Sequence, residues 1–338
     1  MLYNARVSTL LKLLLSMTVA AALVAVTAFL YVRAWQAEPL ALDEDRKVVL
    51  AAGQSFSAFA RQLEADGLLE KAWLWIGLAR LDGSARRVQA GEYWVRAGDR
   101  PGDLLDRLLA GEVVRYEIAL IEGWTLAQAL AALASHPELE QELAGVDETT
   151  VLGVLGLPSG NGEGLFFPDT YHFERGVSDA DILRRAYRKL EEELARAWQS
   201  RDSGLPYESP YDALIVASLI EKETGRDEDR ANISQVFVSR LHRGMRLQTD
   251  PSVIYGVGPT FDGDLTRRHL RTDTPYNTYT RHGLPPTPIA LVGRRSLEAA
   301  MHPAPGEFLY FVSRGDGSSH FSVSLEEHQA AVRRYQLQ

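Results

Sequence analysis

A long uncharged apolar run near the N-terminus limits what this chain can fold into. Residues 13–32 contain no charged side chain, and their polar members are Ser16, Thr18 and Thr27. A helix rises about 1.5 Å per residue, so a run of this length spans roughly 30 Å, the thickness of the hydrocarbon core of a bilayer. The run therefore predicts one transmembrane helix.

The charges around this run predict its orientation. Arg6 and Lys12 precede it, and an acidic patch follows between residues 38 and 45. The positive-inside rule then makes residues 1–12 a cytoplasmic arm and places the rest of the chain on the periplasmic side of the inner (cytoplasmic) membrane. The alternative is a cleaved signal peptide. We favour a retained single-pass anchor, because the run is long and the site at Val32-Arg33-Ala34 carries a charge.

The composition excludes several function classes. The 338 residues are enough for two or three domains, and the net charge of −9 without a long basic run argues against a nucleic-acid binder. Because the chain has no cysteine, disulfides, thiolate nucleophiles and Cys-ligated metals are excluded. His320 and His328 match no zinc spacing, so we expect no metal and no cofactor.

After a polar linker at 33–46, a weak internal repeat covers the N-terminal part of the chain. Strand-like runs at 47–52, 92–97 and 113–121 precede Gly53, Gly98 and Gly123, respectively. Each glycine is followed by apolar residues at helical spacing, with Ser55 and Thr125 at N-cap positions. This order of strand, glycine turn and helix resembles LysM-like modules, which bind N-acetylated glycans. We interpret residues 47–135 as such a subdomain, and a small α+β packing domain without a ligand is an equal alternative.

The segment 209–225 predicts a buried helix that ends in carboxylates. Ser209 and Asp212 form a capping-box-like start with Pro210 at the first helical position, and Gly225 is a natural stop. Almost wholly apolar residues lie between these ends and are followed by Glu221-Lys-Glu223. The two carboxylates lie about 200° apart around the helix, so they cannot act as one close dyad.

These carboxylates have two interpretations. In the first, the helix end reaches solvent and both carboxylates are hydrated. In the second, Glu221 faces a ligand, because Ser218 and Ala217 on the same face are small and leave space above them. An apolar setting would then raise the pKa of Glu221 towards the value that a general acid needs.

Several motifs occur in a fixed order along the chain. They are Glu163-Gly-Leu-Phe-Phe-Pro-Asp-Thr-Tyr171, Glu221-Lys-Glu-Thr, Val236-Phe-Val-Ser-Arg-Leu, Gly244-Met-Arg-Leu-Gln-Thr-Asp-Pro-Ser-Val-Ile-Tyr-Gly256, Pro275-Tyr-Asn-Thr-Tyr279, Gly283-Leu-Pro-Pro-Thr-Pro-Ile289 and Phe308-Leu-Tyr-Phe-Val. The set closely resembles the endolytic murein transglycosylases known as MltG, or YceG-like proteins. The resemblance covers nearly the whole chain. It departs at Pro286-Thr-Pro-Ile-Ala-Leu-Val-Gly293, where the family usually continues Pro-Gly-Pro-Ile-x-Asn-Pro-Gly.

The resemblance implies a reaction. A lytic transglycosylase cleaves the MurNAc–GlcNAc β-1,4 bond without water, because the C6 hydroxyl of MurNAc attacks its own C1 and leaves a 1,6-anhydro end. Ordinary glycosidases need two carboxylates, whereas here the substrate supplies the nucleophile and one carboxyl suffices. The resemblance assigns this acid/base role to the first Glu of the motif, Glu221, and leaves the role of Glu223 open.

The other motifs supply candidate substrate contacts. Gln248 and Asp250 are expected to bind sugar hydroxyls or to hold Glu221, and Tyr276 and Asn277 to stack on and read an N-acetyl sugar. The alternatives are a simple Asx/Pro turn for the first segment and a surface loop ordered by Pro275 for the second. Three aromatic residues are expected in the core and Asp169 is undecided; the three are Phe166, Phe167 and Tyr171.

We therefore expect an α+β protein with a transmembrane helix, a LysM-like subdomain and a catalytic domain at 136–338. The expected function is endolytic cleavage of nascent peptidoglycan strands that terminates their elongation. The resemblance points to glycan-polymerising penicillin-binding proteins as partners. The alternatives are a non-catalytic peptidoglycan-binding scaffold and a hydrolytic muramidase that uses a second carboxylate such as Asp250.

Overall fold

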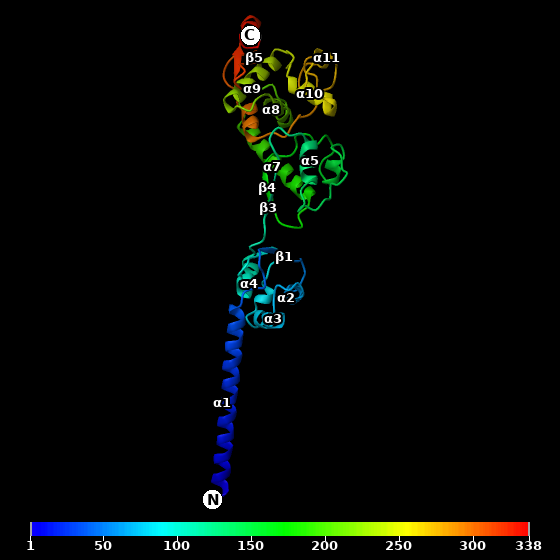
Figure 1. Ribbon diagram of the computed structural model, residues 1–338. Coiled ribbons are helices and arrows are strands. Elements are labelled where there is room, and N and C mark those ends of the chain that lie inside the picture. Colours follow the sequence, from blue (N-terminus) through cyan, green and yellow to red (C-terminus); the bar gives the residue numbers. More distant parts are fainter. Residues whose placement is uncertain (1, 337–338) are drawn as a thin grey trace. The chain divides into compact units, whose positions relative to one another are not determined.

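A computed structural model describes residues 2–336 of the chain, with side chains from residue 11 onward. Met1 and residues 337–338, the outermost parts of the expected arm and catalytic domain, lie outside the described residues. The chain forms two compact units, residues 1–116 and 117–338 (Figure 1). The chain contains both helices and strands, which confirms the expected α+β class.

The first helix, α1 (Leu2–Ala37), contains the whole apolar run. Among the described residues, Leu11–Ala37 is the one helical stretch long and apolar enough to cross a membrane, with a mean hydropathy of 2.4. The helix continues past Val32, and Trp35 and Leu40 are only 4% and 5% exposed in the core of the first unit. The prediction that residues 33–46 form a polar linker is therefore wrong for its first part. Residues 33–37 continue α1, and the side chains of Trp35 and Leu40 are buried in the core.

The globular part of the first unit is built on one antiparallel strand pair. β1 (Arg46–Leu50) pairs with β2 (Gly91–Val95), and Val48 lies opposite Tyr93. Helices α2 (Phe56–Ala65) and α3 (Ala72–Leu81) lie between the strands in sequence, with a 3₁₀ turn at Ser84–Arg86, and α4 (Pro101–Ala110) follows β2.

The three predicted strand–turn–helix segments are confirmed as local structure. Gly53, Gly98 and Gly123 all have φ between 78° and 89°, a left-handed conformation that glycine adopts without steric cost. Ser55 and Thr125 accept the N-cap hydrogen bonds from Ala58 and Gln128.

The third of these segments belongs to the second unit, so the boundary lies at 116/117 rather than at 135/136. β3 (Tyr116–Ala119) pairs with β4 (Thr170–Phe173), and α5 (Leu126–Ala134) follows its glycine turn. The buried Glu163 carboxylate accepts the backbone N–H of Leu126 at 3.0 Å and so holds the start of α5. These bonds join the third segment to later parts of the chain.

The second unit is organised around a buried helix, α8 (Pro210–Glu223). It packs against α7 (Asp179–Ser200), α9 (Asp227–His242), α10 (Asp250–Val257) and α12 (Arg294–Met301). All eight residues from Ala213 to Ile220 are buried, so the core surrounds α8 on every side. The buried helix predicted at 209–225 is confirmed.

Smaller elements complete this unit. They are α6 (Val151–Val154), a 3₁₀ turn at Gly258–Thr260, α11 (Arg267–Arg271), the antiparallel hairpin of β5 (Tyr310–Ser313) and β6 (Ser319–Ser322), and α13 (Leu325–Tyr335). The hairpin packs against α13, and β5 also contacts α9.

Candidate active site

The ends of α8 are well defined, and its two carboxylates lie in its last turn. Ser209 accepts the N–H of Asp212 while the Asp212 carboxylate accepts the N–H of Ser209 at 2.9 Å, so the predicted capping box is formed. The helix ends at Glu223, and Thr224 turns into extended backbone instead of a left-handed glycine cap at Gly225. Glu221 and Glu223 therefore project from different sides of the last turn.

Glu221 is buried in an ion pair. Its side chain is 5% exposed, and Arg230 Nη1 donates to Glu221 Oε1 at 3.2 Å. The backbone N–H of Gly293 donates to Glu221 Oε2 at 3.0 Å, so both carboxylate oxygens have partners. Arg230 also donates to the hydroxyl of Ser296 at 2.6 Å. This network joins α8, α9 and α12.

The space expected above Ser218 and Ala217 is filled by protein. The backbone N–H of Ile289 donates to Ser218 Oγ at 3.1 Å, and α12 packs closely against α8. The small residues therefore permit close packing of the segment 289–301, and the expectation that they leave room for a ligand is wrong.

A further carboxylate, Glu122, lies beside the Glu221 pair. Leu291 exchanges backbone hydrogen bonds with Gly123 and Trp124 at 2.9 and 2.7 Å, which holds this turn in place. A Cβ on Gly293 would collide with the Glu122 carboxylate. Partial burial and the nearby charge of Glu221 raise the pKa of Glu122.

Glu223 lies on a polar cavity of about 480 Å³. The cavity lies between the end of α8, the start of α10, the β5–β6 hairpin and α13. Its polar and aromatic lining includes Glu223, Arg240, Gln248, Asp250, Tyr279, Tyr310 and His328. Two of the expected substrate contacts, Gln248 and Asp250, are thus brought together with Glu223 and not with Glu221.

Burial changes the protonation of Glu223. Desolvation raises its pKa to about 7, and the negative charge of Asp250 contributes in the same direction. Thr249 and the Arg240 guanidinium oppose the rise. Glu223 therefore carries a proton for a large part of the time at neutral pH, as a general acid must.

Gln248 adopts a strained backbone at the cavity. Its φ of 50° is in the left-handed region, where a non-glycine residue is uncommon. Such a conformation costs of order 1 kcal/mol and persists only where surrounding contacts enforce it. Here Gln248 N–H donates to the Thr278 carbonyl at 3.2 Å, and Thr249 N–H donates to Thr278 Oγ1 at 3.0 Å. The strain brings the Gln248 side chain to the cavity next to Asp250.

Asp250 is oriented by a phenol. Tyr279 Oη donates to Asp250 Oδ1 at 2.5 Å, and both residues line the cavity. Burial and the Asp250 carboxylate raise the pKa of Tyr279, so the phenol stays protonated and remains a donor.

The structure places Tyr276 and Asn277 away from the cavity lining. Asn277 is 0% exposed, and its Nδ2 donates to the carbonyls of His269, Leu270 and Thr272. Tyr276 packs edge-to-face on Tyr255, with ring centroids 4.8 Å apart, and its hydroxyl lies 2.9 Å from Thr287 Oγ1. In this structure the Asn277 amide holds the loop, and a role for Asn277 in reading a sugar stays a prediction that these contacts do not support. Tyr276 is also committed to packing.

The far wall of the cavity comes from the C-terminal elements. Tyr310 stacks on His328 with centroids 5.2 Å apart, and the Arg240 guanidinium lies 5.3 Å from the Tyr310 centroid. Burial and the charge of Arg240 lower the pKa of His328. Sequence reasoning missed Arg240, Tyr310 and His328 as cavity residues, although the first two lie within motifs that it singled out.

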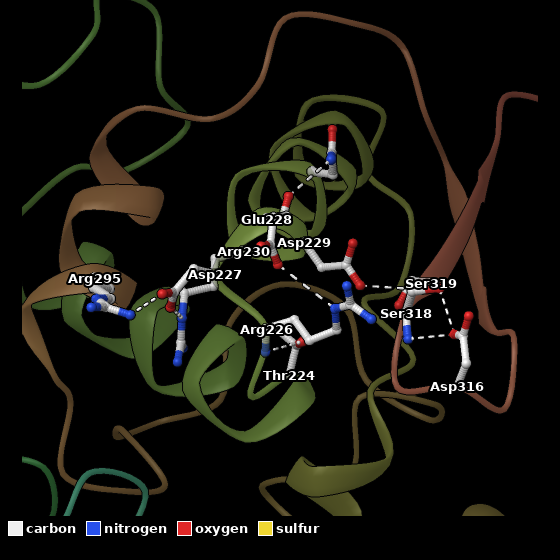
Figure 2. Close-up of polar contacts among 11 residues, drawn as sticks. Thr224, Arg226, Asp227, Glu228, Asp229, Arg230, Arg295, Asp316, Ser318 and Ser319 are labelled. Carbon is white, nitrogen blue, oxygen red and sulfur yellow. Dashed lines mark hydrogen bonds and ion pairs between the residues drawn. The ribbon is translucent and has the colours of Figure 1, made fainter.

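Polar contacts hold the first turn of α9, which follows the carboxylates (Figure 2). Asp229 accepts the backbone N–H of Ser319 at 2.8 Å, which joins this turn to the β6 strand of the cavity wall. Asp227 pairs with Arg295 and accepts from Arg230 Nε at 3.3 Å. Figure 2 shows these contacts on both sides of the turn.

The motif at 163–171 is mostly structural. Phe166, Phe167 and Tyr171 are buried, which confirms their expected place in the core. Asp169 pairs with Lys189 at the surface. Glu163 is 1% exposed and accepts from Tyr255 Oη at 3.1 Å, and burial raises its pKa to about 7.

Comparisons with known proteins agree with this fold. The model of the YceG-like family matches residues 48–334. An endolytic murein transglycosylase of Bacillus subtilis (strain 168) is 31% identical over 91% of this chain and 90% of the relative. One from Streptococcus pneumoniae is 27% identical over 51% of this chain and 32% of its own.

A solved structure also resembles the chain. The crystal structure of a putative yceG-like protein from Listeria monocytogenes has a TM-score of 0.54 at 28% identity, and the match covers 86% of this chain and 99% of that one. The family match spans most of the sequence, which confirms the resemblance drawn from the motifs. The chain belongs to the YceG-like family.

Proposed function

We propose that this protein is an endolytic lytic transglycosylase that cleaves the MurNAc–GlcNAc β-1,4 bonds of peptidoglycan. The observation that carries the proposal is a carboxyl group with a pKa of about 7 on a polar cavity, in a chain whose relatives are named endolytic murein transglycosylases. The cavity offers carboxylates, an amide and flat aromatic rings, the groups that bind sugar hydroxyls and pack on sugar faces.

The geometry favours Glu223 over Glu221 as the acid/base. Each oxygen of Glu221 already accepts a hydrogen bond, one from Arg230 and one from Gly293, and Glu221 does not line the cavity. Glu223 lies on the cavity together with Gln248 and Asp250. We therefore transfer the role that the motif suggested for Glu221 to Glu223, and assign Glu221 to holding α8, α9 and α12 together.

A single carboxyl completes the proposed reaction. Protonated Glu223 donates its proton to the glycosidic oxygen as the C1–O bond breaks, and the GlcNAc hydroxyl leaves. The C6 oxygen of MurNAc forms a bond to C1, and the C6 hydroxyl proton passes to the Glu223 carboxylate. The carboxyl returns to its protonated state, and no water is consumed. Asp250 and Gln248 are assigned to binding sugar hydroxyls.

The anchor would keep this reaction near new strands. We assign α1 to a single pass through the cytoplasmic membrane, with the globular part of the first unit and the second unit on the outer side, because the basic residues lie before the run and the acidic patch after it. Such an enzyme would meet strands as glycan-polymerising penicillin-binding proteins release them and would terminate their elongation. Binding of N-acetylated glycans by the LysM-like first unit remains a prediction.

The products of digestion test the reaction. The full chain in detergent is incubated with purified sacculi, and the glycan ends are identified by mass spectrometry. We expect 1,6-anhydro-MurNAc ends. Reducing ends would instead mean that Asp250 activates water, as in a muramidase. The absence of any new ends would favour a scaffold that only binds glycan.

The pH dependence of the rate tests the acid. The proton that Glu223 must donate is present below about pH 7 and is lost as the pH rises through this value. We expect the cleavage rate to fall above neutrality by up to about tenfold per pH unit. Glu163 titrates in the same range but does not line the cavity, so Glu163→Gln should retain the wild-type profile. A rate that rises above neutral pH would contradict the assignment.

A further inference from the structure

One side of the helix α3 carries large apolar residues that protein does not cover, and Arg80 is the one charged residue of the helix. Its buried face, which includes Leu74 and Trp75, packs into the core of the first unit. The opposite side carries Trp73 and Leu81, which are 65% and 86% exposed. Gly77 lies between them, so the three form one stripe at intervals of four residues. A soluble surface helix ordinarily carries polar residues on such a face.

The start of α3 is fixed beside the end of the apolar run. Lys71, the N-cap residue of α3, places its Nζ 5.5 Å from the centroid of the Tyr31 ring. Trp35 Nε1 donates to the carbonyl of Glu70 at 3.1 Å, and the Trp35 side chain lies in the core of this unit. Tyr31 is the next-to-last residue of the run 13–32, so α3 begins at the level where that run ends.

We propose that α3 is a second membrane contact, which lies in the headgroup layer of the bilayer with Trp73 and Leu81 towards the acyl chains. This inference rests on the proposed membrane anchor. Continuity with α1 carries it, because the contacts of Tyr31 and Trp35 hold α3 at the membrane boundary. Tryptophan is enriched at this depth, and a short helix with an apolar stripe lies there in the plane of the interface.

Two cations flank the stripe in the manner expected at an interface. Lys71 precedes α3, and the exposed Arg80 lies in its last turn next to Leu81, where it donates to Ser57 Oγ at 3.0 Å. Long basic side chains reach outward to phosphate groups while their stems cover apolar surface. With α1 crossing the bilayer and α3 lying on it, the first unit would be prevented from tilting away from the membrane surface.

Site-directed fluorescence tests this contact, and the absence of cysteine in the chain makes single labels simple to place. The full chain is reconstituted into vesicles of phosphatidylcholine and phosphatidylglycerol, with a nitroxide quencher on some of the acyl chains. One environment-sensitive label is attached to Leu81→Cys, Val24→Cys or Val49→Cys. Val24 lies in the apolar run and Val49 on β1, and both are exposed.

We expect labels at positions 81 and 24 to be quenched and the label at 49 to keep its fluorescence. Quenching at 24 without quenching at 81 would overturn the α3 contact and leave the anchor standing. No quenching at 24 would overturn the anchor and the α3 contact with it. Adding Trp73→Glu to the Leu81→Cys chain should reduce quenching at 81, and unchanged quenching would also contradict the proposal.

Discussion

Replacing Glu223 by Gln is expected to abolish glycan cleavage while the protein stays folded. Gln has nearly the same shape but cannot donate the proton, and loss of a general acid/base lowers a rate by about 10²- to 10⁴-fold. Because burial raises the pKa of Glu223, its ionisation at alkaline pH lowers the stability of the folded protein. A neutral side chain there should leave the unfolding temperature unchanged or higher at alkaline pH.

The measurement is the rate at which anhydro ends form on sacculi, beside the thermal unfolding of the same sample. Glu221→Gln is the matched control, because it makes the same chemical change two residues away in the same helix, and it should still cleave when assayed below its own lowered unfolding temperature. A cleaving Glu223→Gln together with a folded but inactive Glu221→Gln would return the catalytic role to Glu221.

Replacing Glu221 by Gln is expected to destabilise the second unit strongly. The change removes the nearer and more deeply buried of the two carboxylates that balance the Arg230 charge, which is only 8% exposed, and leaves the half-exposed Asp227 as its remaining partner. Breaking one side of a buried ion pair costs about 3 kcal/mol or more. For a unit of this size that corresponds to a fall in unfolding temperature of roughly 6–12 °C.

A double variant separates this effect from other causes. Changing Glu221 to Leu and Arg230 to Met removes both charges and keeps apolar volume, and such replacements of buried pairs are often close to neutral. The double variant should therefore unfold at a higher temperature than Glu221→Gln. Equal unfolding temperatures for wild type and Glu221→Gln would show that the pair contributes nothing.

Much of the architecture follows from local sequence signals. The apolar run, the Ser209 capping box and the glycine turns each depend on residues close in the chain, so pattern alone locates their helices and turns. The domain boundary does not follow, because the third strand–turn–helix segment joins the second unit through β4 and Glu163, which come later in the sequence.

The site was predicted only in part, for the same reason. Helical geometry correctly separates Glu221 from Glu223, but the environment of each comes from distant segments. The Gly293 backbone and Arg230 close off Glu221, whereas Tyr310 and His328 build the wall beyond Glu223. Asn277 has the residue type of a sugar ligand, and only the structure shows that its amide serves the loop.

The lining of the cavity has a consequence for when during synthesis the site can form. Tyr310, Leu325 and His328 all come from the end of the chain, whereas Glu223 lies about a hundred residues earlier. A chain still attached to the ribosome can insert α1 and build its first unit, yet it has no closed cleft. On the proposed function, glycan cleavage would then begin only after β5 and α13 have been synthesised and have folded against the end of α8.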